Sequence, residues 1–190
     1  EDPIEFVYPK KRSLINQREL NNHTLSYQQA LKHILRQDSD VVLIGEMRDL
    51  ETISAAITLA ETGCLVFATL HTMDAAQTID RIVDVFPSYQ QSQVRLQLSM
   101  VLKAVLSQQL LPRKDGKGLI AAREILITNK AISNLIREHK TYQIYSALET
   151  GRAVGMITME QAVTALMRKG TITRKTALKS VNNPQLIPKE

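Results

Sequence analysis

The sequence predicts an α/β protein with a mostly parallel sheet and a small helical appendage at its C-terminal end. Strand-like and helix-like segments alternate through the first two thirds of the chain, and two short apolar runs each end on a polar side chain. Strands that alternate with amphipathic helices are typical of parallel sheets. A chain of 190 residues is long enough to form one such core with an addition to it.

The first helix is predicted to begin after Thr24 or Ser26, because either hydroxyl can cap it, and to stop near Asp38. Its apolar residues recur at helical spacing. The run 41–45 follows, and its Val, Leu and Ile residues favour a buried strand.

Asp49 is the predicted cap of a second helix, and Gly63 is placed to end it. The segment 64–70 is the second predicted strand. Two further helices are expected, the first over 74–86 with an aspartate at its cap position. The second is predicted over 88–105 from the spacing of its apolar residues.

The segment 114–118 is a turn signal with two glycines. We expect the strand-like run 119–127 after it to pair with residues near Gln109 as an edge hairpin. Helical spacing returns beyond residue 129, whereas the last residues contain two prolines and no periodicity. The predicted parts are the α/β domain 1–127, a helical subdomain 128–181 and a loose tail 182–190.

The composition is that of a folded protein, with 44% hydrophobic and 23% charged residues. No apolar run approaches the roughly 20 residues that span a bilayer. The chain starts on acidic residues without a methionine, which indicates a cut chain and no signal peptide. A single cysteine, Cys64, excludes a disulfide framework and a four-cysteine zinc site, so a reducing cytoplasmic setting is expected.

Charge is unevenly placed along the chain. Residues 1–110 hold 10 Lys+Arg against 13 Asp+Glu, whereas residues 111–190 hold 14 against 6. The basic block can face nucleic acid, an anionic membrane or an acidic neighbour in an assembly, or it can be a solvated face. No set of stacking aromatics accompanies it, so stable nucleic-acid binding is not expected.

Two side chains stand where the predicted strands end. Glu46 follows the first strand and His71 the second. Ligands of open parallel sheets bind beyond the carboxyl ends of the strands, so Glu46 and His71 are the first candidates for chemistry. A carboxylate at this place commonly serves a phosphate-binding loop, yet no G-x-x-x-x-G-K-[ST] occurs in the sequence.

Three motifs in order carry a resemblance to a known family. Residues 1–5 look like an acidic box, 40–49 like a Walker B segment and 68–72 like a histidine box. The sequence thus resembles the secretion ATPase superfamily, the hexameric motors of type II secretion and type IV pili, over about residues 1–150. The helix 131–138 resembles the Ala-Ile-Arg-Asn-Leu-Ile-Arg-Glu signature of the retraction branch and departs from it only at Ser133.

The resemblance implies a partial RecA-like fold whose phosphate-loop strand lies upstream of residue 1. It implies an ATP-hydrolysing motor subunit for pilus retraction and twitching motility, with this chain alone nearly inactive. The alternatives are a pilus extension, type II secretion or DNA-uptake ATPase of the same superfamily. An alternative of another class is a non-enzymatic interaction module that uses the basic residues.

The resemblance also implies the catalytic groups. Glu5 matches the family's catalytic glutamate, which orients or deprotonates the attacking water. Glu46 matches the Walker B glutamate and is expected to hold Mg²⁺ directly or through water, since Mg²⁺ prefers oxygen ligands. ATP and Mg²⁺ are therefore the expected cofactors. Residue 45 is glycine where most Walker B segments carry aspartate, a form that the family shares.

Three further residues are candidates for nucleotide binding or sensing. His71 is expected to hydrogen-bond near the γ-phosphate. Arg48 is a candidate partner for Glu46, for Asp49 or for a neighbouring subunit's phosphate, with a surface salt bridge as the alternative. Arg81 either bridges subunits or lies on a helix surface.

The resemblance implies partners as well. Asn134, Arg137 and Glu138 are expected to couple the motor to the pilus base. The expected assembly is a homo-hexamer that contacts an inner-membrane pilus platform protein. The expected location is the cytoplasm, at the inner face of the membrane.

Overall fold

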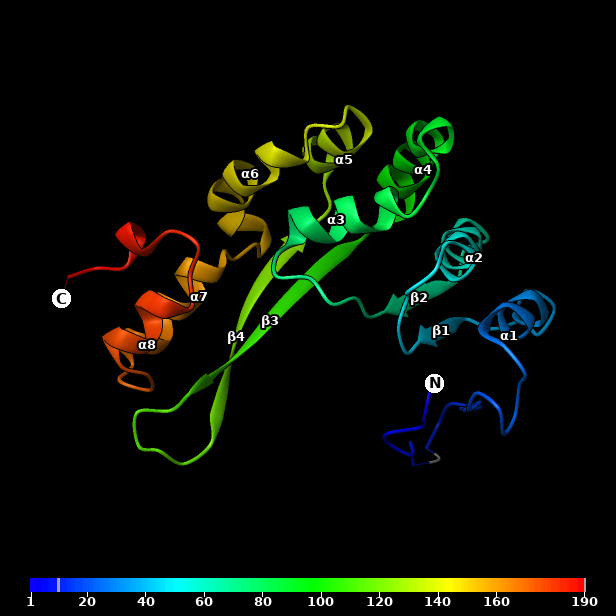
Figure 1. Ribbon diagram of the computed structural model, residues 1–190, viewed down its shortest axis with the longest axis horizontal. Helices are drawn as coiled ribbons and strands as arrows, with labels where there is room; N and C mark the ends of the chain where they lie inside the picture. The colour runs from blue at the N-terminus through cyan, green and yellow to red at the C-terminus, as the bar shows by residue number, and fades with distance from the viewer. Residues whose placement is uncertain (10, 190) are drawn as a thin grey trace. The chain divides into compact units, whose positions relative to one another are not determined.

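The computed structural model describes residues 1–9 and 11–189. The chain divides into two compact units, Glu1–His71 and Thr72–Glu190. Figure 1 labels the helices and strands of each unit. Among the described residues, no helix is both long and apolar enough to cross a bilayer.

The first unit contains two parallel strands and two helices. β1 (Val41–Ile44) pairs with β2 (Leu65–Ala68), and Val41 lies opposite Leu65. α1 (Tyr27–Ile34) and α2 (Leu50–Glu61) pack against each other. The parallel pairing confirms the expected sheet type. The core lies under one face of this sheet and is formed by Leu31, Val42, Ile44, Ala56 and Leu59.

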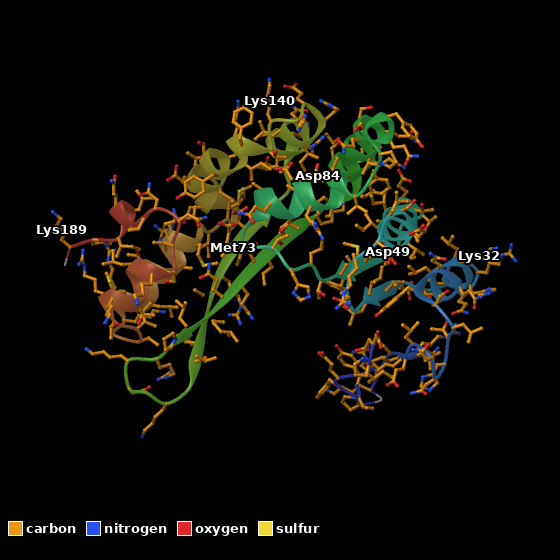
Figure 2. The ribbon with its side chains drawn as sticks, in the orientation of Figure 1. Lys32, Asp49, Met73, Asp84, Lys140 and Lys189 are labelled. Atoms are coloured by element: carbon orange, nitrogen blue, oxygen red, sulfur yellow. The ribbon has the colours of Figure 1, made fainter. Side chains whose placement is uncertain are left out.

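Both helices begin where the sequence predicts. The Ser26 hydroxyl accepts a hydrogen bond from the Gln29 amide at 3.1 Å, which makes Ser26 the cap of α1. Asp49 caps α2, and Figure 2 labels it at the start of that helix. Gly63 follows the end of α2 with a φ of +101°, a conformation that glycine adopts without steric cost.

The second unit is built on a long antiparallel hairpin (Figure 1). β3 (Ala104–Pro112) pairs with β4 (Leu119–Ile127), and Gln109 lies opposite Ala122, which confirms the predicted hairpin. Two helices precede it, α3 (Ala75–Asp84) and α4 (Ser88–Val101). The expected helix to Val105 was wrong, because Val105 belongs to β3 and is buried there by pairing with β4.

Short helices follow the hairpin. α5 packs against α4, and α7 packs against β4. The helices and 3₁₀ turns are α5 (Lys130–Arg137), η1 (Thr141–Gln143), α6 (Ile144–Thr150), η2 (Gly151–Val154), α7 (Met159–Arg168), α8 (Arg174–Lys179) and η3 (Pro184–Leu186).

The compact units do not follow the predicted division at residue 127. The hairpin and the helices after it belong to one unit, because α7 covers β4. The residues after 182 are not uniformly loose either. Ile187 is only 3% exposed and belongs to the same apolar cluster as Leu111 and Met159, so tertiary packing orders a segment that lacks periodicity.

A buried carboxylate connects three elements of this unit. Glu124 of β4 is 3% exposed, and one of its oxygens accepts the Ala75 amide of α3 at 2.9 Å. It also accepts a hydrogen bond from the Met159 amide, at the start of α7. The first amides of a helix have no partner within it, and the helix dipole favours a negative charge at that end. Glu124 therefore fixes α3 and α7 to the hairpin.

Candidate functional site

Glu46 and His71 lie together at the carboxyl ends of β1 and β2. One oxygen of Glu46 is 2.6 Å from Arg48 Nη2, and the other is 3.4 Å from His71 Nε2. The two strands run parallel, so the residues that follow them emerge at the same edge of the sheet. Both residues predicted to follow the strands therefore lie at one edge of the sheet, whereas their roles remain a prediction.

Backbone and side-chain hydrogen bonds hold the two strand ends together. The Met47 amide donates to the Thr69 carbonyl at 3.1 Å, and the Thr69 hydroxyl donates to the Gly45 carbonyl. The side chain of Glu46 is 20% exposed, against 75% for Arg48 and 85% for His71. The Glu46 carboxylate is thus fixed at the sheet edge. The Arg48 guanidinium and the His71 imidazole face solvent and remain accessible to an anion.

Asp49 is occupied by the helix that it caps. Its carboxylate accepts the Thr52 amide at 2.8 Å and the Thr52 hydroxyl at 2.9 Å. Partial burial acts to raise the pKa of Asp49, but the hydrogen bonds from Thr52 outweigh it and lower that pKa. Of the partners considered for Arg48 within this chain, Glu46 is the one with which the guanidinium pairs.

Tyr27 of α1 is a neighbour of this site that the sequence did not reveal. Its hydroxyl lies 3.4 Å from the position that a Cβ at Gly45 would occupy. Burial raises the pKa of Tyr27, and the carboxylates of Asp2 and Glu46 raise it further. The acidic N-terminal residues and Glu46 therefore share one corner of the unit. In the sequence, Tyr27 is an ordinary aromatic of an amphipathic helix, so no signal marked it.

Glu5 lies on the irregular segment before α1. It is exposed, and its side chain has no hydrogen bond or ion pair among the described residues. The segment is held at other points, where the Ile4 amide donates to Glu19 at 3.1 Å and the terminal amine donates to the Arg18 carbonyl at 2.9 Å. The structure does not bring Glu5 into contact with Glu46, and its catalytic role remains a prediction.

The remaining candidates belong to the second unit. Arg81 lies in the last turn of α3 and is exposed. This position is compatible with a contact to a neighbouring subunit and with an ordinary place on the helix surface. On α5, Arg137 donates to the side chain of Asn134 at 2.5 Å. Glu138 follows the helix and pairs with Lys140 at 2.7 Å, the residue labelled beyond α5 in Figure 2. No contact here tests the coupling role of these residues.

The donor set at the sheet edge suits a loosely held magnesium ion. The described residues contain no group of three or more His, Cys, Asp or Glu side chains able to hold a metal. Mg²⁺ at phosphate-transfer sites commonly takes one or two carboxylates and completes its shell with water and phosphate oxygens. The single carboxylate of Glu46 fits that arrangement and does not form a closed metal cage.

Comparison with known proteins gives the family. The pattern of the family described as "Type II/IV secretion system protein" matches residues 1–183. The chain belongs to this family. Within the type II/IV secretion system family, it is 57% identical over 185 residues to the "Twitching motility protein" of Neisseria gonorrhoeae, covering 97% of this chain and 50% of that protein.

Two further matches support the assignment to the family. The chain is 52% identical to the "Type IV pilus retractation ATPase PilT" of Pseudomonas aeruginosa, over 97% of this chain and 54% of that protein. The structure called "Crystal Structure of the Pilus Retraction Motor PilT and Bound ADP" superposes with a TM-score of 0.89 at 49% identity, covering 97% of this chain and 52% of that one. This match confirms the predicted RecA-like α/β class. The chain spans about half the length of these relatives.

Proposed function

We propose that the protein is the ATP-hydrolysing motor subunit that drives retraction of type IV pili. The observation that carries the proposal is its similarity, over nearly the whole chain, to proteins named for twitching motility and for pilus retraction. The arrangement of Glu46, Arg48 and His71 at one sheet edge supports it, because phosphoryl transfer depends on positioned charges of this kind.

Different residues of the chain have different roles at the bound nucleotide. Bound Mg²⁺ would supply positive charge that neutralises the phosphoryl group of ATP during transfer. Glu46 would hold the metal, directly or through water, and its partly buried position keeps the carboxylate in place. Glu5 orients the water that attacks. His71 and Arg48 face solvent at the same edge as Glu46. They would bind the phosphate oxygens of the nucleotide there.

The proposal includes an assembly. Six copies form a ring at the cytoplasmic face of the inner membrane, and Arg81 reaches a neighbouring subunit. Rotation of packed units between nucleotide states moves a platform protein at the pilus base.

Replacing Glu5 by glutamine in the full-length gene product tests the catalytic part of the proposal. Turnover of Mg-ATP is expected to fall at least tenfold, because the amide cannot accept the proton of the attacking water. Equilibrium binding of ATP is expected to survive, since Glu5 contributes to the chemical step. The measurement is the steady-state rate of phosphate release beside a binding titration.

The matched control is Glu61→Gln at the exposed end of α2, which removes the same charge and is expected to retain full turnover. Residues 1–190 alone should release phosphate negligibly, since they contain no phosphate-binding loop. Full activity of the Glu5 variant would show that another residue activates the attacking water. A full-length protein that hydrolyses no ATP would contradict the proposed function itself.

A further inference from the structure

A basic cleft opens in the second unit between the end of α4 and the start of α5. It has a volume of about 520 Å³. We call it the α4–α5 cleft. The lining residues that bear on its ligand are Met100, Leu102, Lys103, Lys130, Asn134 and Arg137.

The charges of the cleft are all of one sign. Lys103, Lys130 and Arg137 line it, and none of its lining residues is acidic. Neither lysine has an ion pair with a carboxylate among the residues that the structure describes. Arg137 donates to the Asn134 side-chain oxygen, so most of its five N–H donors remain available. The cleft therefore presents three cations with no counter-charge of its own.

A hydrogen bond joins the two helices that form the cleft. Ser133 of α5 donates to the Ser99 carbonyl in the last turn of α4 at 2.8 Å, and both serines line the cleft. This contact holds the start of α5 beside the end of α4.

The spacing of the cations indicates the shape of the ligand. Lys130 and Arg137 stand at the two ends of α5, seven residues apart. That separation is about 10 Å along a helix at 1.5 Å per residue. Side chains of an extended chain return to the same face only at every second residue, so two carboxylates that both face α5 stand two or four residues apart, about 7 or 13 Å. Such a pair can meet both cations, since lysine and arginine have long side chains with several rotatable bonds. The apolar Met100 and Leu102 and the amide of Asn134 add the surface that a peptide with mixed side chains needs.

We propose that the α4–α5 cleft binds an acidic, extended peptide segment of a partner protein, with two carboxylates two or four residues apart on one face of the peptide. One carboxylate pairs with Lys130 and the other with Arg137, while Lys103 adds to the attraction. The proposal rests on the proposed motor function, because it gives the chemistry by which a partner is held and moved. A surface of this charge also accelerates encounter with an acidic partner.

The test uses the full-length protein and labelled heptapeptides. Each fluorescein-labelled peptide carries two glutamates in a glycine and leucine background, at separations from one to five residues. Fluorescence anisotropy is expected to give tighter binding at separations of two or four than at one, three or five, because only even separations place both glutamates on one face of an extended peptide. A lysine-for-glutamate peptide is expected not to bind. The double variant Lys130→Glu/Arg137→Glu is expected to weaken binding of the best peptide at least tenfold.

The matched control is Lys114→Glu/Lys117→Glu in the turn of the hairpin, which changes the net charge by the same amount. Equal loss in both double variants, no dependence on glutamate separation, or no binding by the unaltered protein would each overturn the proposal. Binding of anionic phosphatidylglycerol vesicles through Lys130 and Arg137, without peptide binding, would identify a membrane surface instead. Phosphate release measured on the same sample separates the proposed motor function from the proposed peptide site. ATP turnover without peptide binding would reject the peptide site and leave the motor function standing.

Discussion

Replacing Glu46 by glutamine in the full-length gene product is expected to lower ATP turnover by about 100-fold or more. The amide preserves the size of the side chain but removes the negative charge that faces Arg48 at 2.6 Å and His71 at 3.4 Å. A neutral amide oxygen is also a poorer ligand for Mg²⁺ than a carboxylate. The measurement is kcat and KM for Mg-ATP across a range of magnesium concentrations.

The loss is expected to fall mainly on kcat, since a group that stabilises charge in the transition state affects the chemical step. Glu51→Gln is the matched control, because Glu51 is exposed in the first turn of α2 and lies five residues further along the chain. That variant is expected to retain its turnover. A Glu46→Gln enzyme within twofold of the unaltered protein would show that the charge at this sheet edge has no part in catalysis.

Replacing Glu124 by alanine is expected to lower the free energy of unfolding by roughly 2–4 kcal/mol. The change leaves the Ala75 and Met159 amides, at the starts of α3 and α7, without their acceptor in a buried place. Glu149→Ala on the exposed side of α6 removes a carboxylate from the same unit and is expected to have little effect. Urea unfolding of the full-length protein, followed by circular dichroism, gives the comparison.

Glutamine at position 124 separates the charge from the hydrogen bonds. Burial raises the pKa of Glu124 above its unfolded value, against the hydrogen bonds from the Ala75 and Met159 amides. Such a group contributes stability that is fully present below its unfolded pKa of about 4.3 and is lost as the pH rises through the folded pKa. The glutamine variant does not titrate there. Its stability relative to the unaltered protein is therefore expected to improve from about pH 4 to pH 8.

A stability difference between these two proteins that stays constant with pH would show that Glu124 carries no net cost of burial. Equal loss in the glutamine and alanine variants would show that the hydrogen bonds to the two helices require the charge. Either result is distinguishable from simple failure to fold, because the glutamine side chain fills the same volume.

The local signals that predicted the elements were side-chain caps and strand ends. Ser26, Asp49 and Asp74 each accept an amide of the helix that they were predicted to start, since a capping oxygen acts within four residues. The apolar runs before Glu46 and His71 form the parallel pair. Helix caps and strand ends depend on residues that are close together in the sequence. They could therefore be predicted from the sequence alone.

The features that escaped prediction depend on distant contacts. The helical spacing up to Val105 also fits the alternation of a strand, and only pairing with β4 decides between them. Glu124 follows Arg123 in a strand, so sequence alone does not say which side chain faces the core. Ile187 is buried because the cluster around Leu111 and Met159 receives it.

The residues of the candidate site also fall into two groups, those predicted from the sequence and those seen only in the structure. Glu46, Arg48 and His71 were expected from the strand ends and the motifs, and they lie in contact. Tyr27 was not expected, because its place beside Gly45 depends on how α1 packs on the sheet. The α4–α5 cleft combines Lys103 with residues more than 25 positions further along the chain, and only the folded hairpin brings them together.

The most direct test of the central claim is to delete the gene in the organism that encodes it and to count surface pili while measuring twitching. A retraction motor opposes assembly, so its loss is expected to give cells with more pili than the parent and no twitching, with both restored by the intact gene. Cells that lose their pili would identify an assembly motor, and cells unchanged in pili and movement would contradict a pilus function altogether.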